Sequence, residues 1–161
     1  MDVVDQVIAQ WGAEKPQLNT LPMAVMGRLI RSVKHLETAI NQVHKQYGLK
    51  PGEFDMLATL RRSGQPYQLT PSELMANMML SSGAMTNRLD KLEQKGWIER
   101  VHCQQDRRSV QVKLTEQGIT CIESVLEQHV KEQERLMAHM SVDEQQQLNH
   151  LLKALVNPYE S

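Results

Sequence analysis

Residues 69–114 read LTPSELMANMMLSSGAMTNRLDKLEQKGWIERVHCQQDRRSVQVKL. In the first part of this stretch, apolar side chains recur three or four residues apart, which is typical of amphipathic helices. From Trp97 onward apolar and polar residues alternate, which is typical of strands. A polar, charged segment at residues 104–108 interrupts the alternation. The pattern therefore predicts two short helices and then a two-stranded β-hairpin, and the winged helix–turn–helix is the main small fold with that order.

Helix-start signals divide the helical part in two. Thr70 is a suitable N-cap, Pro71 occupies the first helical position, and Glu73 completes a capping box. A second helix is expected to start at Ser81 and to end near Gly96. Its buried stripe is expected to consist of Met85, Leu89 and Leu92.

Longer amphipathic helices flank this region on both sides. The first is expected to end at Gly12, and Gly48 is expected to close the second. The fold class is therefore mainly α with a small β-hairpin, a winged helix–turn–helix with N- and C-terminal dimerisation helices. The expected domains are N-terminal helices (1–48), a DNA-binding domain (49–114) and C-terminal dimerisation helices (115–161). The expected flanking elements are helices at 2–11, 23–47, 51–63, 115–140 and 141–156, and strands at 97–101 and 110–114.

The charge of the chain is unevenly distributed. The 161 residues are 40% hydrophobic and 23% charged, which is typical of a globular protein, and the formal net charge is −1. Residues 81–113 nevertheless carry seven basic and four acidic side chains, whereas residues 114–161 carry three and eight. Because a local basic excess attracts phosphate even when the total charge is near zero, the central segment is the candidate for binding double-stranded DNA.

Several other functional classes lack their sequence signals in this chain. It has no apolar run of membrane-spanning length and no basic start of a signal peptide, so no membrane partner and a cytoplasmic location are expected. The two cysteines, Cys103 and Cys121, are not in metal-binding or disulfide spacing. No glycine-rich phosphate loop or catalytic constellation is recognisable, and no cofactor, metal ion or enzymatic activity is expected.

The second short helix carries the candidate contacts to DNA. Opposite its apolar stripe lie Gly83, Thr86 and Asn87, which suit close approach and hydrogen bonding in a major groove. The start of the helix would add backbone N–H groups that anchor phosphate, although each polar residue there could instead only cap or solvate a surface helix. Arginines at the hairpin tip suit a narrow minor groove, and a solvated turn in which Asp106 pairs with one of them is equally compatible. The remaining candidates are Ser81, Ser82, Arg107 and Arg108.

The same segments resemble the multiple-antibiotic-resistance regulators, the MarR family. The resemblance extends over essentially the whole chain, and it implies a homodimer in which each subunit presents one winged helix–turn–helix to a pseudopalindromic operator. Trp11, residues 52–62 and Arg88 resemble the urate-responsive, PecS-like branch of that family. The most specific similarity lies in residues 69–74, 81–92, 95–97 and 106–115.

The resemblance implies that Trp11, Asp55 and Arg88 bind a small aromatic anion such as urate. Asp55 and Arg88 each flank the apolar stripe of their helix, so they could form a partly buried ion pair. An anion that competes for the guanidinium would move the helix that contacts DNA, and Trp11 would supply a flat face for a ring. The alternative is a structural salt bridge and a tryptophan that only fills the core.

Two further residues are candidate sensors. Cys103 has basic neighbours in sequence, which favour a reactive thiolate. His35, on the long N-terminal helix, could lie near a dimer axis and titrate near neutral pH. An ordinary structural position is the preferred explanation for each residue, and the six histidines show no spacing that pairs them. The expected function is a ligand-released transcriptional repressor; thiol oxidation at Cys103 as the trigger, or a helical adaptor that does not bind DNA, are the alternatives.

Overall fold

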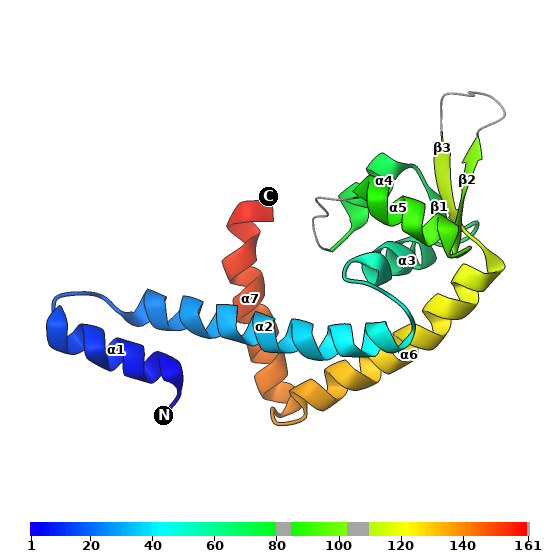
Figure 1. Ribbon diagram of the computed structural model, residues 1–161. Coiled ribbons are helices and arrows are strands. Elements are labelled where there is room, and N and C mark those ends of the chain that lie inside the picture. Colours follow the sequence, from blue (N-terminus) through cyan, green and yellow to red (C-terminus); the bar gives the residue numbers. More distant parts are fainter. Residues whose placement is uncertain (80–84, 103–109, 161) are drawn as a thin grey trace. The chain divides into compact units, whose positions relative to one another are not determined.

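The computed structural model describes residues 1–79, 85–102 and 110–160 (Figure 1). The chain divides into two compact units, Met1–Ile40 and Asn41–Ser161, which are described separately. The helices are α1 (Val3–Glu14), α2 (Leu21–Gln46), α3 (Glu53–Arg62), α4 (Pro71–Asn77), α5 (Met85–Gln94), α6 (Glu116–Met137) and α7 (Val142–Glu160), and the strands are β1 (Gln68–Leu69), β2 (Ile98–His102) and β3 (Val110–Leu114).

The sheet has three antiparallel strands in the order β1-β3-β2, so the expected hairpin is present but has a third partner. In the hairpin Ile98 lies opposite Leu114, and His102 lies opposite Val110. On the other edge of β3, Leu69 lies opposite Val112. The prediction of only two strands was wrong because β1 has two residues, which is too short for an alternating pattern to be visible.

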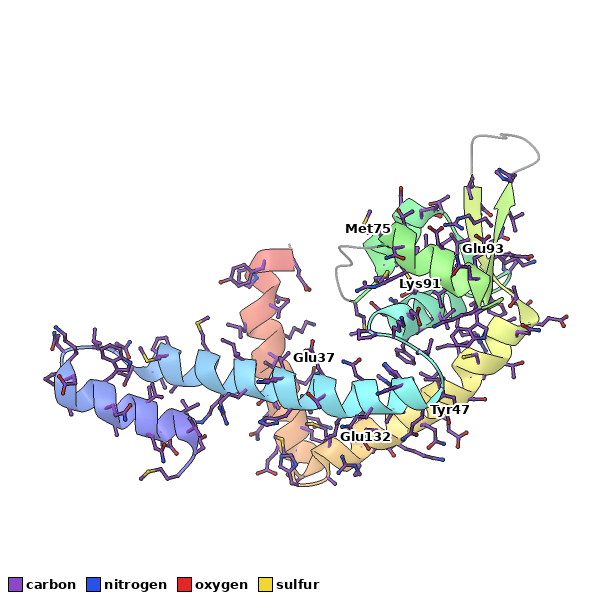
Figure 2. The ribbon with its side chains drawn as sticks, viewed as in Figure 1. Glu37, Tyr47, Met75, Lys91, Glu93 and Glu132 are labelled. Atoms are coloured by element: carbon purple, nitrogen blue, oxygen red, sulfur yellow. The ribbon has the colours of Figure 1, made fainter. Side chains whose placement is uncertain are left out.

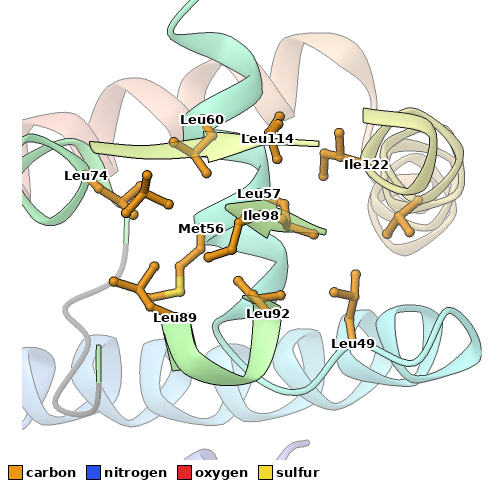
Figure 3. Close-up of a cluster of buried hydrophobic side chains, with 12 residues drawn as sticks. Leu49, Met56, Leu57, Leu60, Leu74, Leu89, Leu92, Ile98, Leu114 and Ile122 are labelled. Carbon is orange, nitrogen blue, oxygen red and sulfur yellow. The ribbon is translucent and has the colours of Figure 1, made fainter. Parts of the chain in front are cut away.

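The core of the second unit lies between α3, α5, α6 and the sheet (Figure 3). From α5, Leu89 and Leu92 are buried and Met85 is half-buried against the same cluster, which confirms the predicted apolar stripe. Removing one such side chain from water contributes about 1.5–3 kcal/mol, so this stripe determines which face of α5 points outward. The other buried members of the cluster are Leu49, Met56, Leu57, Leu60, Leu74, Ile98, Val112, Leu114, Ile122 and Val125.

The capping signals are confirmed, whereas some predicted helix ends are wrong. The Thr70 hydroxyl accepts from the Glu73 N–H at 3.2 Å, and the Glu73 carboxylate accepts from the Thr70 N–H at 2.8 Å. Helix α1 continues through Gly12, since a single glycine weakens a helix without the left-handed backbone that would end it. Helix α3 begins at Glu53, after a turn in which Gly52 has a left-handed φ of 82°.

The first unit is held by ion pairs between its two helices. Arg28 of α2 contacts Asp2 at 2.9 Å and Asp5 at 2.5 Å, at the start of α1. Next to this cluster, buried Val4 packs on Gly27, where a Cβ would be 3.5 Å from the valine methyl groups. The small residue therefore allows the two helices to approach closely.

Two helices leave much apolar surface exposed. Within α7 no residue is buried, and α2 exposes a row of large apolar side chains. Across the described parts of the chain, no helix combines the length and the apolar character needed to cross a bilayer. The exposed apolar residues on these helices include Met26, Ile30, Val33, Val142, Leu151 and Leu155.

Gly118 provides a test of the packing between α6 and the sheet. A Cβ at this position would be 1.9 Å from the carbonyl oxygen of Trp97. We expect Gly118→Ala to lower the free energy of unfolding by about 2 kcal/mol, because the rigid backbone must move. In contrast, nothing lies within 4 Å of a Cβ at Gly12, and Gly12→Ala should raise it by up to about 1 kcal/mol. Urea denaturation followed by circular dichroism measures both changes, and an unchanged midpoint for Gly118→Ala would contradict the packing.

Candidate nucleic-acid interface

Helix α5 presents a polar face to solvent. Thr86 and Asn87 are exposed, whereas Leu89 on the opposite side is buried, so two predicted DNA-contacting residues lie on the predicted face. Backbone at the start of a helix and short polar side chains on its exposed face are suited to phosphate and base-edge contacts. The other predicted DNA contacts, Ser81, Ser82, Gly83, Arg107 and Arg108, lie outside the described residues, as does Cys103.

Arg100 joins the wing strand β2 to α5. Its Nη2 contacts Asp90 Oδ1 at 2.5 Å, its Nη1 pairs with Glu93 Oε2, and its backbone N–H donates to Glu93 Oε1 at 3.2 Å. Glu93 lies on the side of α5 next to β2 (Figure 2). The single positive charge of Arg100 offsets one of the two negative charges on a helix whose exposed face would meet a polyanion. The sequence analysis did not predict this role of Arg100. The one available signal was the spacing of Asp90 and Glu93, which puts two carboxylates on the same side of a helix, where they can share a basic partner.

Arg88 lies against the turn that precedes α3. A Cβ at Gly52 would be 2.7 Å from Arg88 Nη1, so the guanidinium occupies the space that any larger residue would need. Asp55 is three residues further along, and its Oδ1 accepts a hydrogen bond from the Met79 N–H at 3.4 Å. Asp55 and Arg88 are both half-buried, as the sequence predicted. The start of α3 is thus the element that the guanidinium of α5 contacts.

Trp11, the third predicted ligand-binding residue, lies on α1 in the first unit. Its side chain is 41% exposed within the single chain. An exposed indole offers an apolar face together with an N–H donor, a combination that suits a polar aromatic molecule. The side chain is therefore accessible, which a tryptophan that only filled the core of one subunit would not be.

Glu53 and Lys95 form a second connection between α3 and α5, one that the sequence reasoning missed. Glu53 is 1% exposed, and its Oε2 accepts from Lys95 Nζ at 2.6 Å and from the Lys50 N–H at 2.8 Å. Lys95 Nζ also donates to the Gly48 carbonyl at 2.8 Å and lies 5.0 Å from the centre of the Trp97 ring. No spacing rule pairs residues 53 and 95, so only tertiary structure could reveal this contact.

A stack of three rings connects the end of α2 with α3 and α6. The imidazoles of His44 and His129 lie side by side with centroids 5.2 Å apart, and the centroid of the Phe54 ring is 4.3 Å from each of them. His44 Nε2 is 3.0 Å from His129 Nδ1. Burial, and then the charge of His129, lower the pKa of His44 to about 4, and burial lowers the pKa of His129. No local spacing in the sequence indicates this pair, because the partners are 85 positions apart.

The candidate sensor His35 and the second cysteine, Cys121, lie in ordinary positions on their helices. His35 is exposed on α2. Cys121 is half-buried on α6, and burial raises the pKa of its thiol, which makes it less reactive. Among the described residues, no group of three or more side chains is arranged to hold a metal ion.

Comparison with known proteins identifies the family. Residues 49–110 match the MarR family. Over 158 residues the chain is 40% identical to the HTH-type transcriptional regulator PecS of Dickeya dadantii, which covers 96% of this chain and 95% of PecS. The chain belongs to the MarR family. It is also 32% identical over 133 residues to the multiple antibiotic resistance protein MarR of Salmonella typhimurium, covering 81% of this chain and 90% of that protein.

Solved structures of MarR proteins have the same fold. A cysteine-to-serine mutant of MarR from E. coli, crystallised in complex with operator DNA, matches with a TM-score of 0.72 and 29% identity, over 87% of this chain and 99% of that one. The MarR-family chain is therefore a DNA-binding transcriptional regulator and not an enzyme. In the winged helix–turn–helix, α4 and α5 are the helix pair, α5 is the recognition helix, and β2 and β3 form the wing.

The histidine stack should make the stability of this MarR-family regulator depend on pH. Because folding lowers the pKa of His44 from 6.5 to about 4, the unfolded chain binds the proton more tightly. The titration of His44 therefore leaves the free energy of unfolding unchanged above pH 6.5. As the pH falls from 6.5 towards 4, it lowers the free energy of unfolding by up to about 1.4 kcal/mol per pH unit. Urea denaturation at pH 7.5 and 5.0 (about 150 mM salt, to limit surface effects) measures the loss.

A matched pair of variants assigns this pH dependence to the stack. His44→Phe preserves an aromatic ring against Phe54 but removes the titrating group, so its stability should fall less between the two pH values than that of the wild type. His35→Gln removes an exposed histidine and should behave as the wild type does. A loss of stability for His44→Phe as large as that of the wild type would show that other groups cause the pH dependence.

Proposed function

We propose that this MarR-family regulator is a homodimeric repressor that binds a pseudopalindromic operator and is released by a small anionic aromatic ligand such as urate. The supporting observation is that α5 combines two features. Its exposed face carries Thr86 and Asn87, while its half-buried Arg88 lies against the start of α3. A ligand that draws the guanidinium away from α3 would also displace the face that contacts DNA.

The proposed contacts to DNA divide between two grooves. Thr86 and Asn87, together with the small residues that precede them, would contact base edges and phosphates in the major groove. The wing arginines would enter the minor groove, where the negative potential is strongest. The residues proposed in these roles are Ser81, Ser82, Gly83, Thr86, Asn87, Arg107 and Arg108.

The exposed apolar helices support the proposal of a homodimer. Leu151 of α7 is 64% exposed and Ile30 of α2 is 66% exposed. Helices that expose several large apolar side chains are typical of proteins that bind a partner. Two subunits related by a two-fold axis would present two α5 helices, one helical turn of DNA apart, which explains why the expected operator is pseudopalindromic.

The proposed ligand site consists of Trp11, Asp55 and Arg88. Arginine binds carboxylate-like and enolate oxygens through two parallel hydrogen bonds, and an anion could therefore compete for it with the protein. Asp55 belongs to the first turn of α3, one turn after the glycine that the guanidinium contacts, so it would be affected when Arg88 moves. Trp11 is included because its exposed ring suits an aromatic ligand and because of the resemblance to urate-responsive regulators.

Specific DNA binding can be tested through Asn87. An operator duplex is first selected by the wild-type protein from a randomised library, and dissociation constants are then measured by fluorescence anisotropy. Asn87→Ala should weaken operator binding by about tenfold, the equivalent of one base contact, and leave binding to random duplex unchanged. Gln133→Ala, which removes an exposed amide from α6, is the matched control and should bind as the wild type does. Unchanged operator affinity for Asn87→Ala would exclude this residue from base readout.

Release by ligand can be tested through Arg88. Urate titrated into the operator complex should dissociate the wild-type protein, with a coupling of about 5- to 150-fold in DNA affinity. Arg88→Ala and Asp55→Asn should show a much smaller ratio between operator affinity without urate and with urate, whatever their affinity without it. Arg135→Ala, which removes an exposed guanidinium from α6, should show the full ratio. If urate and related phenolic anions leave the wild-type complex intact, this ligand class is wrong. A peroxide response that disappears in Cys103→Ser would then favour oxidation as the trigger.

A further inference from the structure

We propose that Glu53 is a positioning residue for DNA binding, because together with Lys95 it holds the C-terminal end of the recognition helix in place. This proposal depends on the chain binding DNA through α5, and it does not depend on the identity of the ligand. Lys95 directly follows the C-terminal end of α5, whereas Thr86 and Asn87 lie near its start. Neither residue needs to touch DNA.

The contacts of Lys95 reach three separate segments. Its Nζ is 2.6 Å from the Glu53 carboxylate at the start of α3, 2.8 Å from the Gly48 carbonyl after α2, and 5.0 Å from the Trp97 ring centre before β2. Lys95 directly follows the last residue of α5. The ammonium group therefore joins the end of the recognition helix to the elements on either side of it.

The buried Glu53 carboxylate restricts the position of the Lys95 ammonium group. It is 1% exposed, and its Oε1 has no hydrogen-bond donor among the described residues. A buried carboxylate with one unsatisfied oxygen adds little stability compared with an apolar side chain of the same volume. It is nevertheless directional, since moving the ammonium away from Oε2 would leave a buried charge without its partner. The pair thus penalises displacement of the helix end more strongly than apolar packing would.

The two ends of α5 contact consecutive residues. Near its start, Arg88 lies against Gly52, and after its end, Lys95 pairs with Glu53. The carboxylate that binds Lys95 is buried, so this pair holds the C-terminal end of α5 in place. The positions of Thr86 and Asn87 relative to a DNA groove therefore depend on Glu53.

Glu53→Gln tests this role without ligand. Glutamine has the same shape and can still accept from Lys50 and Lys95, but it lacks the charge that holds the ammonium. Operator binding should weaken by about tenfold, the equivalent of one charge-assisted hydrogen bond. Binding to random duplex should not change, because every basic side chain is still present. Hydrogen exchange should become faster for the amides of residues 91–97 and stay unchanged in α6.

The matched control is Glu123→Gln, which removes the exposed 2.6 Å pair between Glu123 and Arg61 of α3. It breaks an ion pair of the same helix without touching α5, and its operator affinity should equal that of the wild type. Should Glu53→Gln fold poorly, the double variant Glu53→Gln/Lys95→Met removes both charges, leaves no buried ion unpaired, and should show the same loss of operator binding.

The outcomes separate this proposal from the others. A lower melting temperature for Glu53→Gln with an unchanged ratio of operator to random-duplex affinity would assign Glu53 a purely structural role and overturn the proposal. An equal loss on both duplexes in the double variant, with wild-type binding by Glu53→Gln, would show that Lys95 acts by contacting phosphate, which also overturns it. If the wild-type protein selects no sequence from the library, the proposal of sequence-specific binding fails instead.

Discussion

The left-handed turn at Gly52 is the constraint on which the arrangement of the DNA-binding domain depends. With a φ of 82° and no Cβ, Gly52 lets the Arg88 guanidinium lie directly against the backbone where α3 begins. The next residue, Glu53, binds Lys95 beyond the other end of α5. A single turn therefore contacts the recognition helix at both ends, and the apolar stripe between them completes its attachment. Any larger residue at position 52 would have to displace the guanidinium.

Charge is arranged so that the recognition helix can approach a polyanion. The chain as a whole is slightly acidic, and α5 itself carries the carboxylates of Asp90 and Glu93. Arg100 from the wing strand pairs with both carboxylates, offsets one of their two charges, and joins the wing strand to the helix. The recognition helix and the wing are thereby held in one relative orientation, as the proposed contacts of both with DNA would require. The electrostatic function and the mechanical function of Arg100 are inseparable for this reason.

Local signals in the sequence predicted local structure well. The capping box of Thr70, the buried stripe of α5 and the hairpin are all found, since each depends on residues close together in the chain. The third strand was missed because it has two residues. The pairs His44–His129 and Glu53–Lys95 were missed because their partners are 85 and 42 positions apart. In the candidate site, the orientation of Thr86, Asn87, Asp55 and Arg88 followed from helical periodicity, but the contact of Arg88 with Gly52 required the tertiary structure.

The division between apolar and polar contacts would let the recognition helix respond to the proposed ligand. Leu89 and Leu92 hold α5 to the core without directional preference, whereas the Arg88 guanidinium lies against Gly52 and Lys95 pairs with Glu53. A change of angle then costs about as much as one charge-assisted hydrogen bond, roughly 1.5–3 kcal/mol. Coupling free energies between two binding sites are typically about 1–3 kcal/mol. The cost of changing the angle of α5 is therefore similar to a typical coupling free energy. We infer that an anion competing for one guanidinium supplies enough free energy to reorient α5 while its core stripe stays buried.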